Sequence, residues 1–123
     1  MTFSKIEKIH GKYLSIKVNN QINRIFFEEN GNGIPLICLH TAGSDSRQFR
    51  HLLNNKQITS KYRFIAFDLP WHGKSDPPAN YMEIEYKLTT KSYMNIIINF
   101  CKALNLKNPV IIGCSMGGRI ALH

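Results

Sequence analysis

Three short apolar runs, each ending abruptly in a loop of small and polar residues, constrain the fold of this chain more than any other feature. They cover residues 36–39, 64–67 and 110–112. A half-exposed strand alternates apolar and polar residues, whereas a continuous apolar run suits a strand that is buried on both faces, as in a parallel sheet covered by helices. The three runs therefore predict the central strands of an α/β fold.

The segments around these runs supply the remaining elements. Residues 13–18 and 22–27 are β-prone and are separated by Asn19, Asn20 and Gln21, which predicts an antiparallel hairpin. An apolar stripe predicts a longer helix over about residues 89–104; it consists of Tyr93, Ile97, Phe100 and Leu104.

A shorter helix is expected after the first apolar run. Asp45 followed by Gln48 predicts a capping box, and Phe49, Leu52 and Leu53 follow at helical spacing. A hairpin followed by alternating strands and helices predicts one α/β domain over residues 1–123, with an N-terminal hairpin and a mostly parallel sheet between flanking helices.

The third apolar run leads directly into Gly113-Cys114-Ser115-Met116-Gly117, and a helical pattern begins at once. Gly-x-Ser-x-Gly between a strand and a helix is typical of a nucleophile elbow, a strained turn that raises a serine hydroxyl above the sheet. The residues two before and two after the serine come so close that side chains would clash, which glycine avoids. Ser115 is therefore the predicted nucleophile, with Gly113 and Gly117 as elbow glycines.

Two upstream loops follow the other apolar runs and should lie at the same edge of the sheet, because parallel strands end there together. One is His40-Thr41-Ala42-Gly43, and the other runs from Asp68 to Ser75. With the elbow, they resemble the N-terminal half of an α/β-hydrolase fold serine hydrolase. The resemblance implies acyl transfer from a small ester-like substrate to water, with no cofactor and no metal.

The resemblance also implies the oxyanion hole. In the family, the loop matching residues 40–43 supplies one backbone N–H, and the residue after the nucleophile supplies the other. The implied donors are the amides of Ala42 and Met116. Thr41 stands where the family usually has glycine, so the amide next to Ala42 stays an alternative donor.

The loop from Asp68 to Ser75 resembles the family's D-x-x-G-x-G-x-S loop, in which Asp68, Gly73 and Ser75 match. Trp71 stands in place of a glycine. The resemblance implies a structural role for Asp68, Gly73 and His40, with Asp68 bracing backbone amides and taking no part in a catalytic triad.

The rest of a triad is missing from the sequence. In this fold the order is serine, then an acid, then histidine. No acidic residue follows Ser115, and His123 is the only later histidine. We therefore expect a C-terminally truncated domain that is inactive alone and needs a missing C-terminal half. The apolar strand over 110–112 would form an open edge, which predicts a marginally stable or aggregation-prone chain.

Two other function classes stay open. A truncated hydrolase could be a noncatalytic relic or a binding module. The segment Gly113–Gly118 also has the G-x-x-x-x-G spacing of a nucleotide-binding phosphate loop, but Arg119 and Ile120 follow where that loop needs lysine and then serine or threonine.

Composition narrows the partners and the compartment. The formal net charge is +8, but no basic run with interleaved aromatics accompanies it, so we expect no nucleic-acid partner. The three cysteines lack metal-ligand spacing, and their odd number suits free thiols in a reducing compartment. The sequence has no signal-like apolar segment and no apolar stretch long enough for a bilayer, so we expect a cytoplasmic protein without a membrane partner.

Overall fold

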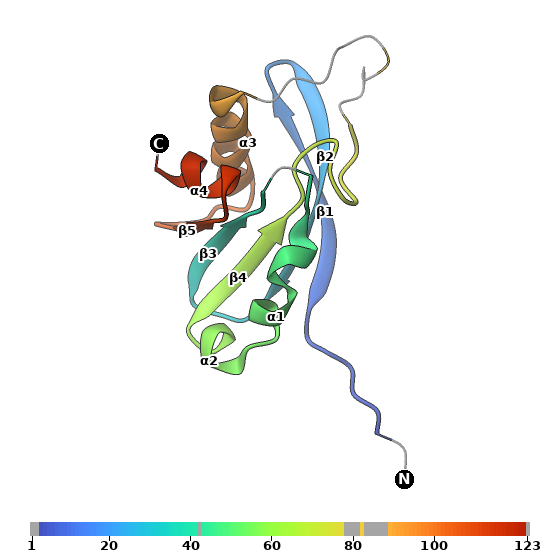
Figure 1. The fold of residues 1–123 in the computed structure, drawn as a ribbon, viewed down its shortest axis with the longest axis vertical. Helices are drawn as coiled ribbons and strands as arrows, with labels where there is room; N and C mark the ends of the chain where they lie inside the picture. Colours follow the sequence, from blue (N-terminus) through green and yellow to red (C-terminus); the bar gives the residue numbers. More distant parts are fainter. Residues whose placement is uncertain (1–2, 42, 78–81, 83–88, 123) are drawn as a thin grey trace.

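The protein is built on a mixed sheet, seen here in a computed structural model that describes residues 3–41, 43–77, 82 and 89–122. Within those residues, five strands lie in the order β1-β2-β4-β3-β5 (Figure 1). The strand bounds are β1 (His10–Val18), β2 (Gln21–Asn30), β3 (Ile34–Leu39), β4 (Tyr62–Phe67) and β5 (Val110–Gly113).

The pairing of the strands confirms the α/β class and the hairpin. Strand β3 runs parallel to both of its neighbours, β4 and β5. Strand β2 pairs antiparallel with β1 and also with β4. The sheet is therefore mixed, with equal numbers of parallel and antiparallel pairs in the described part, and the prediction of a mostly parallel sheet was too strong.

The hairpin turns through two residues only. Asn19 and Asn20 have φ angles of 51° and 63°, both in the left-handed region. Two successive left-handed residues match the twist of the flanking strands, and asparagine tolerates this conformation better than most residues. Gln21, which was expected in the connection, instead begins β2.

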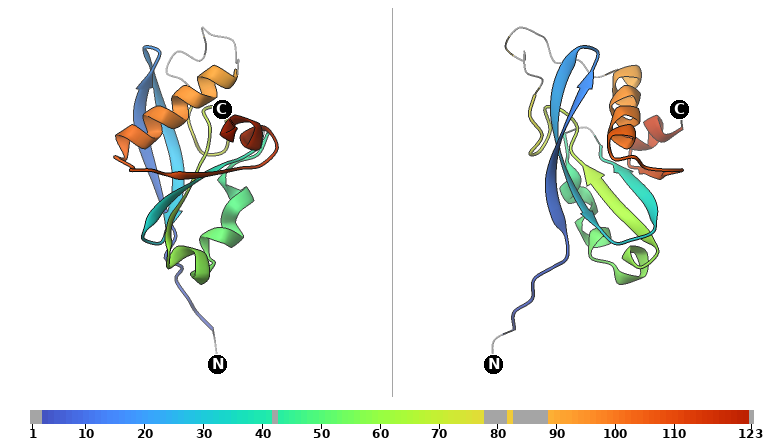
Figure 2. Two further views of the ribbon diagram at one scale, coloured as in Figure 1. Left: turned by 90° about the vertical axis from the view of Figure 1, so that its left-hand side faces the viewer. Right: turned by 180° about the vertical axis from the view of Figure 1, so that it is seen from behind.

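The helices cover both faces of the sheet (Figure 2). On one side lie the short helices η1 (Ser46–Phe49), α1 (Arg50–Leu53) and α2 (Lys56–Thr59), and on the other lie α3 (Thr90–Ala103) and α4 (Met116–Ala121). The sequence analysis did not predict α2. Asp45 does cap η1, by accepting from the Arg47 N–H. The predicted capping box with Gln48 was wrong, because the Gln48 side chain bonds the Thr41 amide instead.

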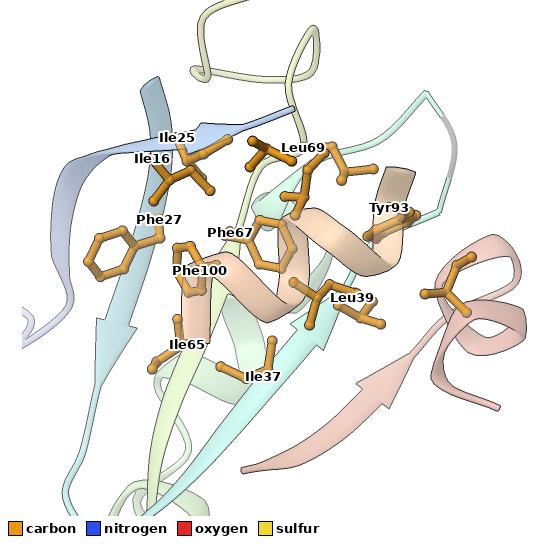
Figure 3. Close-up of a cluster of buried hydrophobic side chains, with 14 residues drawn as sticks. Ile16, Ile25, Phe27, Ile37, Leu39, Ile65, Phe67, Leu69, Tyr93 and Phe100 are labelled. Atoms are coloured by element: carbon orange, nitrogen blue, oxygen red, sulfur yellow. The ribbon is translucent and has the colours of Figure 1, made fainter. Parts of the chain in front are cut away.

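Alternate residues of the central strands fill two cores, which explains their continuous apolar runs. On β3, Ile37 and Leu39 face the cluster under α3, whereas Leu36 and Cys38 face the cluster under α1. Strand β4 divides in the same way, with Ile65 and Phe67 on the α3 side (Figure 3). Because side chains alternate between faces, a strand covered on both sides must be apolar at every position.

Helix α3 closes the larger core with Phe100, whose ring packs between those of Phe27 and Phe67, with centroids 5.4 and 4.9 Å away. The helix ends at Ala103; beyond it Asn105 has φ 54°, and the Leu106 N–H returns to the Cys101 carbonyl. This left-handed residue with a six-to-one hydrogen bond is a Schellman motif. The helix over 89–104 is thus confirmed to within one residue at each end.

Candidate functional site

Ser115 lies on a strained turn between β5 and α4. Strand β5 ends at Gly113 and α4 begins at Met116, so only Cys114 and Ser115 connect them. Ser115 has φ 52° and ψ −109° and is exposed. A positive φ is uncommon for a residue other than glycine and is retained only where the surrounding structure enforces it. The residue is therefore held in an unusual conformation with its side chain at the surface.

The two elbow glycines sit where no side chain fits. A Cβ at Gly113 would lie 2.2 Å from the backbone of Gly117, and a Cβ at Gly117 would lie 2.2 Å from the Leu39 carbonyl oxygen. A Cβ at Gly118 would meet nothing nearer than 3.1 Å. The close approach that the Gly-x-Ser-x-Gly spacing suggested is thus present, and it involves the end of β3 as well as the turn itself.

The elbow is anchored beside the loop that follows β3. Gly113 pairs with Leu39 in the parallel ladder, and the Cys114 N–H donates to the Leu39 carbonyl at 3.1 Å. The His40–Gly43 loop starts at the next residue, so Ser115 and that loop leave the sheet at the same edge. Ala42, one predicted oxyanion donor, lies outside the described residues.

Met116, the other predicted donor, is the first residue of α4 and is half-buried. The N–H groups of a helix's first turn have no acceptor within the helix, so the Met116 amide has no partner inside α4. The Thr41 amide, the alternative to Ala42, donates to the Gln48 side chain at 3.1 Å. Sequence reasoning missed this use of Gln48, and no sequence pattern marks it.

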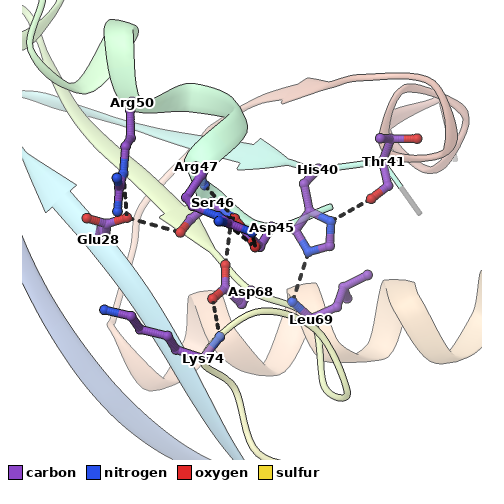
Figure 4. Close-up of polar contacts among 10 residues, drawn as sticks. All are labelled: Glu28, His40, Thr41, Asp45, Ser46, Arg47, Arg50, Asp68, Leu69 and Lys74. Carbon is purple, nitrogen blue, oxygen red and sulfur yellow. Dashed lines mark hydrogen bonds and ion pairs between the residues drawn. The ribbon is translucent and has the colours of Figure 1, made fainter. Parts of the chain in front are cut away.

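His40 is completely buried and joins two loops. Its Nε2 accepts from the Leu69 N–H at 3.1 Å, and its Nδ1 lies 2.8 Å from the Thr41 carbonyl oxygen (Figure 4). An accepting Nε2 requires the neutral ring with its proton on Nδ1, which then donates to Thr41. Burial, assisted by nearby His72, lowers the pKa of His40. The ring therefore acts as a neutral hydrogen-bonding link.

Asp68 braces the loop after β4. Its Oδ1 accepts from the Ser46 N–H at 2.6 Å, and its Oδ2 accepts from the Lys74 N–H at 2.8 Å (Figure 4). Gly73 lies directly against this carboxylate, because a Cβ there would approach Asp68 Oδ2 to 2.3 Å. Ser75 completes the arrangement by donating to the Asp68 carbonyl. Both carboxylate oxygens are thus occupied by backbone amides.

Asp45 is another acid near this edge, and its carboxylate is also hydrogen-bonded. Arg47 donates to both of its carboxylate oxygens at 2.8–3.1 Å, and these hydrogen bonds lower the pKa of Asp45. Among the described residues, no acid or histidine is hydrogen-bonded to the Ser115 side chain. The described part of the chain thus places the predicted nucleophile next to one predicted oxyanion donor, without a hydrogen-bonded base and orienting acid.

The described segments contain no group of three or more His, Cys, Asp or Glu side chains that could hold a metal ion. None of their helices has both the length and the apolar content needed to cross a membrane. Where the structure describes them, all three cysteines are free, and Cys38 is buried, which raises the pKa of its thiol to about 12.

Comparison with known proteins gives consistent matches. The "alpha/beta hydrolase fold" family matches residues 34–123. An AB hydrolase superfamily protein of Bacillus subtilis is 32% identical over 99 residues, which make up 80% of this chain and 34% of that protein. A putative esterase/lipase of Mycoplasma pneumoniae is 33% identical over 86 residues, 70% of this chain and 30% of the relative. The chain thus spans about a third of the curated relatives it matches.

Solved structures agree on the fold. The N-acyl homoserine lactonase AidH, complexed with N-butanoyl homoserine, superposes with a TM-score of 0.73 and 28% identity over 90% of this chain and 39% of that one. A thermophilic esterase from Thermogutta terrifontis gives a TM-score of 0.75 over 89% of this chain and 39% of that one, and at 22% identity it shows likeness of fold only. Because the family match takes in most of the sequence, including β3, β4 and the elbow, this chain belongs to the alpha/beta hydrolase fold family.

Proposed function

We propose that Ser115 is the nucleophile of a serine hydrolase that transfers the acyl group of a small ester-like substrate to water. The observation that carries the proposal is the backbone of Ser115, whose φ of 52° places an exposed serine on a turn built by two obligatory glycines. Such strain costs about 1–3 kcal/mol and clusters at functional sites. The relatives named as an esterase/lipase and a homoserine lactonase support an ester or lactone as the substrate class.

The family resemblance implies an oxyanion hole, and two of the amides concerned differ in whether they have an acceptor in the structure. The Met116 N–H begins a helix and lacks an intrahelical acceptor, while the Thr41 N–H is taken by Gln48. We keep Met116 and Ala42, the donors that the resemblance implies, as the two that bind the negative oxygen formed when Ser115 attacks the carbonyl carbon. Each donor contributes about 3 kcal/mol of transition-state stabilisation in enzymes of this kind.

Proton transfer requires groups from elsewhere. A serine hydroxyl is a weak nucleophile without an adjacent base. His40 and Asp68 cannot serve, because both are buried and fully occupied by backbone groups. We assign the base and its orienting acid to residues beyond this sequence, so residues 1–123 alone are expected to be inactive.

Fluorophosphonate labelling of the protein produced from its native gene tests the assignment. Such a probe reacts with an activated serine, and mass spectrometry should locate it on Ser115. Ser115→Ala should abolish labelling and lower kcat/KM for p-nitrophenyl acetate by about 10³-fold or more. Ser60, an exposed serine at the opposite edge of the sheet, provides the control, since Ser60→Ala should change neither result.

The noncatalytic class makes the opposite prediction for the same experiment. A folded protein that carries no label on Ser115, and that hydrolyses p-nitrophenyl acetate no faster than its Ser115→Ala variant, would be a relic or a binding module. Binding of a nucleotide analogue by the folded protein would instead support the phosphate-loop class.

A further inference from the structure

An open cavity lies beside the predicted oxyanion loop. Its volume is about 720 Å³, and it is bounded by two loops that follow β3 and β4. The lining residues are Gly43, Ser44, Asp45, Arg47, Trp71, His72 and Gly73. Gly43 belongs to the oxyanion loop itself, so the cavity adjoins the place where the carbonyl of a substrate would bind.

Trp71, on the wall of this cavity, has an unusual backbone. Its φ is 69°, in the left-handed region that glycine adopts freely, and the matching position of the family motif is usually glycine. The residue nevertheless keeps 36% of its surface exposed. A bulky residue in a disfavoured conformation on an exposed loop indicates that its side chain has a use there.

The topology places Trp71 and Ser115 on either side of the oxyanion loop. Strands β4, β3 and β5 are neighbours in that order, and each is followed at the same edge by one of the three loops. The hydrogen bond from the Leu69 N–H to His40 ties the Trp71 loop to the oxyanion loop. A substrate with its carbonyl at Ser115 could therefore extend a chain across the loop toward the indole ring.

The chemistry of the cavity favours an apolar chain. An indole presents a large apolar face with a single N–H donor. Arg47, a cation on the lining, is paired with both carboxylate oxygens of Asp45, so the charges of the two side chains offset each other. We infer that Trp71 is a specificity-determining residue that receives the apolar chain of the ester substrate, an inference that rests on the proposed role of Ser115.

Binding can be measured through Trp71 itself, because it is the single tryptophan of the 123 residues. The chain is titrated with methyl acetate, butyrate and hexanoate, and separately with ethyl, butyl and hexyl acetate. Binding should shift the tryptophan emission to shorter wavelength, and the shift should saturate. In one of the two series, the affinity should rise about two- to fourfold for each added methylene. The series that shows the rise identifies the acyl or the alcohol chain. Affinity independent of length in both series would overturn the inference.

Variants separate a specificity role from a structural one. In the protein from the native gene, Trp71→Phe should keep the increase of kcat/KM with chain length, and Trp71→Gly should abolish it. Glycine suits the φ of 69°, so the second variant is expected to fold. Phe3, 86% exposed in the N-terminal segment, is the control, and Phe3→Gly should leave the dependence intact. A Trp71→Gly enzyme with an unchanged dependence would refute the role.

The two proposals fail in distinguishable ways. Ser115→Ala should retain the chain-length dependence of binding, because the serine hydroxyl is not part of the cavity wall. Chain-length-dependent binding without a labelled Ser115 would reject the nucleophile and keep the Trp71 subsite. A labelled Ser115 with no chain-length dependence would reject the Trp71 subsite alone.

Discussion

At the scale of single residues, the elbow depends on contacts that leave no room for a methyl group. We expect Gly117→Ala to lower the free energy of unfolding by about 3 kcal/mol, because its Cβ would meet the Leu39 carbonyl oxygen at 2.2 Å and that backbone cannot yield cheaply. Urea denaturation of both proteins measures the difference.

Gly118 provides the matched control for this substitution. It is also within α4, but a Cβ there would meet the Gly113 carbonyl oxygen at 3.1 Å, and alanine favours a helix. Gly118→Ala is therefore expected to change the free energy of unfolding by less than about 1 kcal/mol. Equal losses for the two variants would show that helix α4 does not press against β3 as described.

The buried His40 makes stability depend on pH. Burial lowers the pKa of His40 in the folded protein, and His72, Asp68 and Asp45 are the other ionisable groups that act on it. The unfolded chain takes up this proton near pH 6.5, whereas the folded protein resists it. The contribution of neutral His40 to the free energy of unfolding should therefore be complete above about pH 7. It should be lost progressively as the pH drops through about 6.5 toward the lowered pKa.

Substitution of His40 isolates its share of this pH dependence. His40→Gln keeps an acceptor for the Leu69 N–H without a titrating ring, so stability should vary less between about pH 7 and pH 5. His10, exposed on β1, is the control, and His10→Gln should leave the pH dependence unchanged. A His40→Gln protein with the pH dependence of the parent would contradict the neutral, accepting ring.

At the scale of elements, α3 begins with a complete capping box. The Thr89 hydroxyl accepts from the Ser92 N–H at 3.0 Å, and the Ser92 hydroxyl accepts from the Thr89 N–H at 2.9 Å. Thr89→Ala should lower the free energy of unfolding by about 1 kcal/mol in urea denaturation. Thr90 is exposed and lies within the first turn, so Thr90→Ala should cost nothing measurable and serves as the control. Equal losses of unfolding free energy for Thr89→Ala and Thr90→Ala would show that the Thr89 cap does not stabilise α3.

Helices and strands could be predicted from the sequence where a pattern of neighbouring apolar residues determines them. The strands within β3 and β4 followed from uninterrupted apolar runs, and α3 followed from an apolar stripe. Helix α2 was missed because its four residues are too few to show a helical period and none of them is buried. The capping box at Asp45 was wrong because the Gln48 side chain accepts from Thr41, in the loop that leads into η1, and the path of that loop in space brings the two together.

At the scale of the whole molecule, β5 forms an apolar edge of the described sheet. Val110, Ile111 and Ile112 are 38–44% exposed, and an unprotected apolar edge is a template for pairing with another chain. We expect residues 1–123 to self-associate, and Ile112→Lys to weaken association by about tenfold or more because an unpaired charge resists burial. Sedimentation velocity at several concentrations measures this.

Charge alone could also reduce association, since the chain already carries a net charge of +8. Ile6→Lys adds the same charge at a position that is 94% exposed and outside the sheet, and it should leave association unchanged. A parent chain that is monomeric and unfolds in a cooperative thermal transition would contradict the expectation that it self-associates through β5.

The amino-acid sequence by itself determined the local features of this protein: the hairpin turn at Asn19 and Asn20, the alternating burial of β3 and β4, and a glycine-flanked serine between a strand and a helix. These depend on residues close together in the chain, where backbone sterics and side-chain period are decisive.

Only the tertiary structure decided which distant groups meet. It placed β2 against β4, joined His40 to Leu69 across 29 positions, and occupied both oxygens of Asp68 with amides from two loops. Hydrogen bonds and packing act over a few ångströms in space, and separation along the chain does not reveal that distance. For the same reason no sequence pattern reveals the cavity beside Trp71, which loops from two separate parts of the chain form together.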